Sequence, residues 1–359
     1  MRRLLSISLL AVSTSVATAQ DAPAPEEDAV KTRFSVAAID DATFYGGLRA
    51  PLPTVLNRVL VEPSFSLRYK DRVKFSTSLV GETQTYSDTA TQVHVKELYT
   101  GLSAGDFDLT AGRKMLRWGT GYAFTAAGVL DPPRHPDDPG DRLSVNEGRD
   151  MVKLDWVRGQ HALTAAWSTA AMATTGTNLH DTTAIRYNVL VHGFDTSLIA
   201  GDDRGGDAFG GVTFTRVLGQ AWELHGEGIW REQAAALIGA KCTLRSGVTF
   251  VGEFYTPPNT TYFRDSTVSP LAGRQHYAYG SVSKTRLREL PGWKEWDVSA
   301  AMVSNLDDQS FTGIVDVSRW FGNHVSSYVH MEFPHGGAIS DYGAAPYTTA
   351  ASVGVRFQL

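Results

Sequence analysis

The stretch Ala351–Leu359, ASVGVRFQL, ends the chain in strict alternation. Apolar side chains stand at every second position from 353 to 359, and the residues between them are small or polar. Successive side chains of a β-strand point to opposite faces, so this period of two predicts a strand with one apolar and one polar face. Most chain ends are frayed and polar. An apolar strand at the very end therefore predicts that the last residues pair within a sheet.

The same alternation recurs along most of the chain. SFSLRYK (64–70), MVKLDWV (151–157) and AWELHGEGIW (221–230) each separate apolar from polar side chains in this way. Short breaks such as Asp71-Arg72 alternate with long polar breaks such as 119–148. This pattern is typical of an antiparallel up-and-down meander with two unequal ends. It predicts an all-β chain of about 18 strands, with 16 as the alternative.

The meander is expected to close into a transmembrane β-barrel rather than a soluble sandwich. A sandwich carries loops of similar length at both ends, whereas these strands run for roughly 10 to 13 residues, the length that crosses a bilayer when tilted. In lipid every backbone polar group must be paired, so the last strand must pair with a first strand near Phe34 to Phe44. Aromatic residues near strand ends are expected to form interface belts. These are Tyr69, Trp118, Trp156, Trp167, Trp222, Trp230, Trp296 and Phe357.

The beginning of the chain indicates export. MRRLLSISLLAVSTSVATAQ combines two arginines, a short apolar run and the small-x-small site Ala17-Thr18-Ala19. This is the layout of a secretory signal peptide, and the apolar run is shorter than the ~20 residues of a membrane-spanning helix. We therefore expect a signal peptide over residues 1–19, an acidic periplasmic leader over 20–31 and the barrel over 32–359.

Composition narrows the remaining classes. Outside the signal no run of 18 apolar residues occurs, which argues against helical membrane spans. The single cysteine, Cys242, cannot form an internal disulfide. The net charge is −5 and no basic patch stands out, so nucleic acid is not an expected partner.

The most distinctive stretch is GRKMLRWGTGYAFTAAGVLDPPRHPDDPGDRLSVNEGRD, Gly112–Asp150. Its GR…LRWGTGY part resembles the strand-to-loop signature of several porin-like families of large outer-membrane barrels. Those families tend to place Asn-Pro soon after WGxG, where this chain has FTAAGVLDPP. The terminal strand also resembles the assembly signal of Gram-negative outer-membrane barrels, although it ends Phe357-Gln358-Leu359 rather than on Phe. The resemblance implies a bacterial outer-membrane location and recognition of the C-terminal strand by the barrel-assembly machinery.

The loop 119–148 has two interpretations that the sequence leaves open. A long, proline-stiffened loop can fold into the lumen and constrict the pore, or it can cap the barrel from outside. Calcium binding by Asp131, Asp137, Asp138 and Asp141 is not expected, because their spacing matches no known loop motif. The candidates for pore constriction are Arg113, Arg117, Arg134, His135, Asp137, Asp138, Asp141 and Arg142.

Alternation also predicts which charged residues face the lumen. They carry both signs in near balance, which predicts modest ion selectivity, since strongly selective pores show rings of one sign. The predicted wall residues are Arg68, Glu97, Lys153, Glu223, His225, Glu227, Glu332 and Arg356.

No catalytic or metal-binding constellation emerges from the sequence. His225 and Glu227 share a face with Glu223, but no serine lies in a recognisable nucleophile setting. His324 and His330 lack assignable further ligands, so neither a metal nor a cofactor is expected.

The expected function is passive passage of small hydrophilic solutes through a porin-like channel embedded in outer-membrane lipid. A non-channel barrel with a structural or surface-interaction role is the first alternative, and a barrel-hosted hydrolase is the second. The sequence leaves open whether several identical chains assemble.

Overall fold

The computed structural model describes residues 30–49, 53–85, 89–132, 134–136, 143, 146–169, 181–203, 208–231, 233–257, 276–287 and 292–359. These residues form one 18-stranded antiparallel sheet, which confirms the predicted architecture and strand number. The strands are β1 (Val30–Gly46), β2 (Val55–Tyr69), β3 (Val73–Thr85), β4 (Thr89–Ala104), β5 (Phe107–Lys114), β6 (Arg149–Arg158), β7 (His161–Thr169), β8 (Thr182–Val191), β9 (Phe194–Asp203), β10 (Ala208–Leu218), β11 (Trp222–Trp230), β12 (Ala234–Thr243), β13 (Val248–Thr256), β14 (Tyr277–Lys284), β15 (Trp296–Asn305), β16 (Ser310–Phe321), β17 (Val325–His335) and β18 (Thr349–Gln358).

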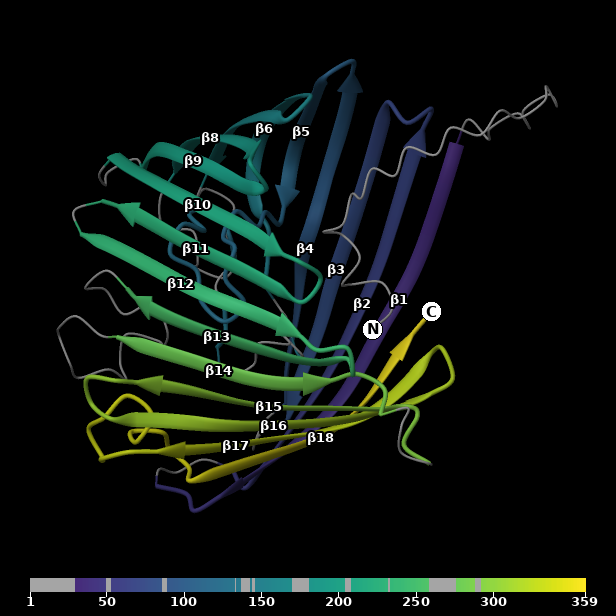
Figure 1. The fold of residues 1–359 in the computed structure, drawn as a ribbon. Helices are drawn as coiled ribbons and strands as arrows, with labels where there is room; N and C mark the ends of the chain where they lie inside the picture. Colours follow the sequence, from purple (N-terminus) through teal and green to yellow (C-terminus); the bar gives the residue numbers. More distant parts are fainter. Residues whose placement is uncertain are drawn as a thin grey trace.

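The sheet closes on itself because β1 pairs with both β2 and β18 (Figure 1). The register with β18 runs from Ala37 opposite Gln358 to Gly46 opposite Thr349. Closure pairs the backbone groups that an open sheet would leave at its edges, as a bilayer requires. The predicted pairing of the last strand with the first is confirmed. The expected signal peptide, residues 1–19, lies outside the described residues, and so does the expected leader up to residue 29.

Apolar side chains cover the outside of the barrel, and its interior holds buried polar side chains as well as two apolar clusters. On β18, Val353 and Val355 are each 50% exposed, whereas the neighbouring Ser352 is 2% exposed. Trp118 departs from the expected aromatic belt. It is 4% exposed and lies in the segment after β5, because that strand ends at Lys114. Within the described ranges, no helix is long and apolar enough to cross a membrane.

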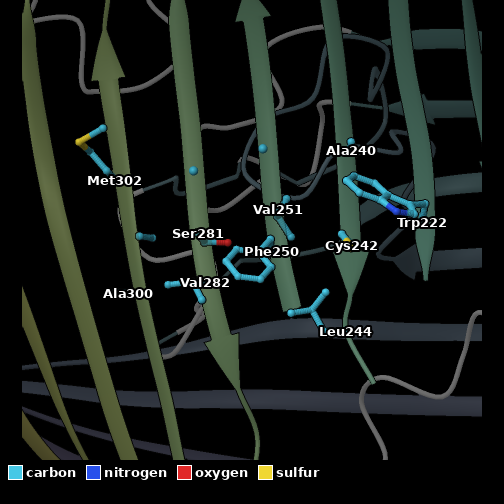
Figure 2. A pocket seen from close by; sticks show the side chains of 13 residues that line it. Trp222, Ala240, Cys242, Leu244, Phe250, Val251, Ser281, Val282, Ala300 and Met302 are labelled. Carbon is cyan, nitrogen blue, oxygen red and sulfur yellow. The ribbon is translucent and has the colours of Figure 1, made fainter. Parts of the chain in front are cut away.

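The outer face carries a hollow over β11 to β15 (Figure 2). Its volume is about 870 Å³, and its lining is almost entirely apolar. Gly252 on β13 and Gly280 on β14 lie directly opposite each other within it. The absence of side chains at this pair leaves the sheet locally uncovered.

One strand departs from strict alternation. The β3–β4 register shifts between Ser78 and Leu79, which lie opposite Glu97 and Val95 respectively, so Lys96 is the extra residue of a β-bulge. Lys96 Nζ lies 2.9 Å from Glu62 Oε2. The bulge brings a lysine beside Glu97, which period-two reasoning does not predict.

Candidate functional site

The segment between β5 and β6 is here called the lumen loop, and its described residues are 115–132, 134–136, 143 and 146–148. Residues 116–130 of this loop fold into the interior of the barrel (Figure 1). Its Leu116, Trp118 and Leu130 form a buried cluster with residues of β6 to β12 such as Met151 and Phe209. The wall residues of this cluster are apolar, so burial of the loop side chains against them stabilises the inward course of the loop. Of the two interpretations that the sequence left open, the structure shows the inward one for the described residues of the loop.

A second buried cluster holds the tip of the described loop against β12 to β16. Phe124 is completely buried and stacks on Tyr255, with ring centroids 5.1 Å apart and an interplanar angle of 15°. Tyr277 lies 6.0 Å from the same ring. Tyr342, from the segment between β17 and β18, belongs to this cluster. The two clusters together fix the loop along the wall from β6 to β16.

Glu227 on β11 anchors the backbone of the loop. Its Oε2 accepts hydrogen bonds from the N–H groups of Ala126 at 2.7 Å and Ala127 at 2.8 Å, while its Oε1 accepts from Gly121 at 2.8 Å and also from the N–H of Thr120. The residue is 5% exposed. Buried backbone N–H groups need acceptors, and one carboxylate here supplies acceptors to four of them.

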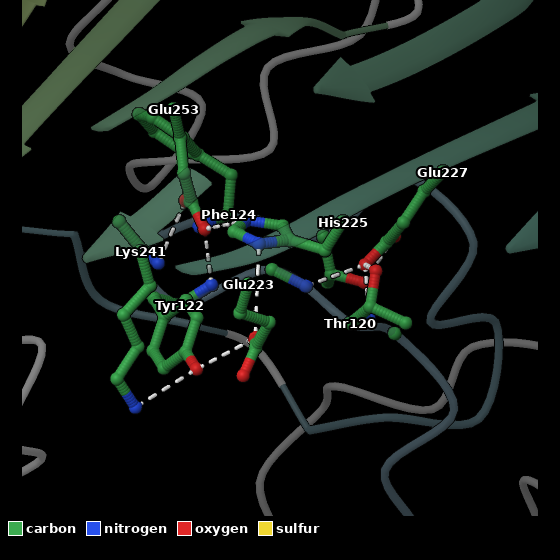
Figure 3. Close-up of polar contacts among 12 residues, drawn as sticks. Thr120, Tyr122, Phe124, Glu223, His225, Glu227, Lys241 and Glu253 are labelled. Atoms are coloured by element: carbon green, nitrogen blue, oxygen red, sulfur yellow. Dashed lines mark hydrogen bonds and ion pairs between the residues drawn. The ribbon is translucent and has the colours of Figure 1, made fainter. Parts of the chain in front are cut away.

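Glu253 on β13 anchors the neighbouring residues of the loop in the same way. Its Oε2 accepts from the N–H groups of Ala123 at 2.9 Å and Phe124 at 3.2 Å, and its Oε1 accepts from the N–H of Tyr122. His225 Nε2 lies 3.0 Å from Glu253 Oε1. Figure 3 shows both carboxylates directed at the loop backbone from the barrel wall. Main-chain contacts to these two carboxylates therefore hold the loop in addition to the packing of its apolar side chains.

The side chain of Tyr122 connects the loop to two further residues of the barrel wall, Glu223 and Lys241. Its hydroxyl donates to Glu223 Oε1 at 2.9 Å and accepts from Lys241 Nζ at 3.1 Å (Figure 3). Burial and the nearby charge of Glu223 raise the pKa of the Tyr122 phenol well above its ordinary value. The phenol therefore stays protonated and can keep donating to Glu223.

Within the loop, Asp131 closes a local turn. Its Oδ1 accepts from the N–H of Trp118 at 2.6 Å and its Oδ2 from the N–H of Gly119 at 3.0 Å. Burial raises the pKa of Asp131 to about 6, although these N–H groups oppose the shift. Its oxygens serve the protein backbone, so it acts as an internal brace for the loop.

The two ends of the loop are tied together by charge. Arg113 contacts Glu147 at 2.9 Å and Asp150 at 2.8 Å, and His94 Nδ1 lies 3.1 Å from Glu147. Just before Arg113, the backbone of Gly112 has a φ of +121°, and a Cβ there would lie 2.3 Å from the carbonyl oxygen of Leu98. Only glycine fits this position without displacing the backbone.

The described constriction candidates differ in how far they are buried. Arg113 is buried in the ion-pair cluster at the base of the loop, and Arg117 is exposed. Arg134 is partly buried and directs its guanidinium at loop carbonyls, including that of Gly119 at 3.3 Å. His135 is exposed. The remaining candidates lie outside the described residues, and they are Asp137, Asp138, Asp141 and Arg142.

The predicted wall residues occupy inward positions in the register. Glu97 accepts from the N–H of Met115 at 3.0 Å, and Lys153 pairs with Asp155. Arg68 is exposed and contacts Asp71 at 3.2 Å. On β17, Glu332 lies 3.0 Å from His330 Nε2. Arg356 stands on β18 opposite Ile39 and Ser326.

His225 does not occupy an accessible position. It is completely buried beneath Tyr122, whose ring centroid lies 5.3 Å away, so a solute in the lumen does not reach its ring in this structure. Among the residues that the structure describes, no group of three or more histidine, cysteine, aspartate and glutamate side chains is placed to hold a metal ion.

Sequence reasoning missed the anchoring role of Glu227 and Glu253. A signal was present in the WGTG stretch, because Gly119 and Gly121 stand where the loop approaches Glu227. A Cβ at Gly119 would lie 3.0 Å from Glu227 Oε1, and one at Gly121 would lie 2.3 Å from the carbonyl oxygen of Phe124. Gly119 therefore permits the close approach of the loop backbone to the Thr125 hydroxyl and the Glu227 carboxylate, and Gly121 permits the tight turn towards Phe124.

No protein-family model matches the chain, and no curated protein matches it. Solved structures do share its fold. The outer membrane protein OprD from Pseudomonas aeruginosa is 12% identical, with a TM-score of 0.62 over 91% of this chain and 94% of OprD. OccK5 (OpdH) from the same organism is 8% identical, with a TM-score of 0.60 over 91% of this chain and 98% of OccK5.

A mutant of Rh. blastica porin is 13% identical, with a TM-score of 0.51 over 92% of this chain and 100% of the porin. At such identities the likeness concerns the fold, and the family indicated by the Gly112–Tyr122 stretch stays a prediction. The chain has the closed barrel fold seen in outer-membrane porins.

Proposed function

We propose that this chain forms a water-filled channel in the outer membrane of a Gram-negative bacterium and that small hydrophilic solutes cross it passively. The closed barrel, the apolar outer face and the polar interior support a membrane-spanning pore. The porin fold of its structural neighbours supports the same assignment. The C-terminal strand β18, which closes the barrel by pairing with β1, is the segment that the barrel-assembly machinery would recognise.

The observation that carries the proposal is the one-sided attachment of the lumen loop. Both of its buried clusters and both of its glutamate anchors involve the wall from β6 to β16. A loop held against one wall narrows a lumen, and its exposed charges then line the narrowed passage. Among the described residues of the loop, Arg117 is an exposed charge of this kind, whereas Arg134 directs its guanidinium at loop carbonyls.

The opposite wall supports a hydrophilic path. Near the turn at residues 70–72, the inner faces of β1 to β3 carry small hydroxyl groups and cations that are half-buried or exposed. Ser35 and Ser64 are hydrogen-bonded to each other at 2.7 Å across β1 and β2. Other polar residues of this surface are Arg33, Ser66, Arg68, Lys74 and Ser76.

Single-channel recording in planar bilayers tests the proposal. Purified wild-type protein is expected to give defined conductance steps. The double variant Glu227→Gln/Glu253→Gln should give larger or more variable steps, because the loop loses acceptors for its backbone. Glu82→Gln is the matched control, since Glu82 is equally buried and inward-facing but pairs with Arg58 on the opposite wall. Electrical silence of the wild type would instead support the structural or surface-interaction alternative.

A further inference from the structure

The hollow on the outer face arises from small residues in adjacent strands. Ala240 on β12, Gly252 on β13 and Gly280 on β14 lie side by side in the register, so their absent or minimal side chains leave one continuous depression. Met302 on β15 ends this row. A Cβ built on Gly252 or on Gly280 would meet no heavy atom within 4 Å. The floor is thus open space and is not covered by neighbouring side chains.

Bulky apolar side chains form the rim. Phe250 follows the same face of β13, two residues from Gly252, and Val282 lies opposite it on β14. Trp222 on β11 is 51% exposed and stands on the side of the hollow nearer the short turns. Figure 2 shows the Trp222 and Phe250 rings flanking Cys242, which is itself only 8% exposed. The depression is comparable in volume to pockets that hold small ligands, ~300–1,000 Å³.

Position and charge identify the occupant. The hollow extends from the middle of β13 and β14 to the short-turn ends of β11 and β12, on a face that the proposed function places against membrane lipid. Towards the short turns, the same strands end at Lys284 on β14 and at Arg245 in the exposed turn between β12 and β13. An apolar channel with cations at its aqueous end matches a lipid with an acyl chain and an anionic headgroup.

We propose that this hollow is a binding site for one acyl chain of a glycerophospholipid, whose phosphate lies near Arg245 and Lys284. A second copy of the chain fits less well, because a symmetric contact at this face would bring two Arg245 turns close together. The site rests on the proposed membrane location, but it faces away from the lumen and is independent of conduction.

Native mass spectrometry of protein released from nanodiscs of phosphatidylethanolamine and phosphatidylglycerol tests the site. Wild type is expected to retain one phospholipid at detergent levels that strip the rest. Gly252→Leu and Gly280→Leu should lower the retained fraction at least fivefold, because a Cβ at either position meets no heavy atom within 4 Å and the leucine side chain then occupies the floor. Gly210→Leu is the matched control, since Gly210 is exposed on β10 and a Cβ there also meets nothing within 4 Å.

Each outcome bears on the proposal. Loss of the lipid in both leucine variants, with retention in Gly210→Leu, supports it. Equal retention in all four proteins overturns it, and so does a wild-type dimer that the leucine variants convert to monomer, because the occupant is then a second copy. Arg245→Gln by itself should also lower the retained fraction of lipid below that of wild type, because it removes the proposed contact with the headgroup phosphate. Conductance of the leucine variants should equal that of wild type, so failure of the lipid site and failure of the channel are separable.

Discussion

Replacing Glu227 by glutamine tests the anchoring of the lumen loop most directly. Each oxygen of Glu227 accepts two backbone N–H groups, and the side chain is 5% exposed. Glutamine keeps one acceptor oxygen but turns an NH₂ group towards the other two N–H groups. Two buried donors are then left without an acceptor, and each such loss costs ~1–3 kcal/mol. The free energy needed to release the loop from the wall should therefore fall by roughly 2–6 kcal/mol.

Hydrogen exchange of the loop amides measures this release. At the lower bound of about 2 kcal/mol, the population of released loop rises roughly 30-fold, since ~1.4 kcal/mol is a factor of ten. Peptides covering residues 120–127 of Glu227→Gln should exchange faster by at least that factor in detergent micelles. Peptides from β1 to β3 should keep their wild-type rates.

The control and the refutation are both specific. Glu82→Gln removes the same charge from an equally buried inward position without touching the loop, so its 120–127 amides should exchange as in wild type. If the amides of residues 120–127 exchange at wild-type rates in Glu227→Gln, the carboxylate does not hold the loop. The clusters around Phe124 and Trp118 would then have to account for its position alone.

Three further outcomes follow from the structure. Between pH ~4 and ~6, Asp131 binds a proton in the folded protein but not in the unfolded chain. The free energy of unfolding, measured by denaturant titration, should therefore fall as pH rises through this window, and Asp131→Asn should remove this pH dependence. Gly112→Ala should lower the free energy of unfolding by more than about 1 kcal/mol, because the φ of Gly112 is +121°. Gly101→Ala should lower it by less, because a Cβ at Gly101 makes only ordinary contacts, and thermal melts followed by circular dichroism compare the two variants. Reversal potentials in salt gradients should show less than about tenfold preference for either ion sign, and a larger preference would contradict the mixed charges of the lumen wall.

The fold could be predicted because its determinant is local. Period-two alternation, as in ASVGVRFQL, reports which side of each strand is apolar, and strands in lipid can pair every backbone group only by forming a closed sheet. The strand number, the pairing of β18 with β1 and the inward side of Glu227 and His225 all follow from it. Trp118 was misplaced because alternation alone does not reveal where β5 ends.

The course of the lumen loop is decided by tertiary structure. Glu227 and Glu253 meet backbone groups about 100 to 130 positions earlier in the sequence, and no local pattern specifies such contacts. Every residue except proline has the same backbone N–H group, so a site built from these groups leaves only indirect traces in the sequence, such as Gly119 and Gly121. The β-bulge at Lys96 and the hollow at Gly252 and Gly280 likewise depend on which strands become neighbours. Sequence set the two faces of the barrel wall, whereas only folding decided what lies against each face.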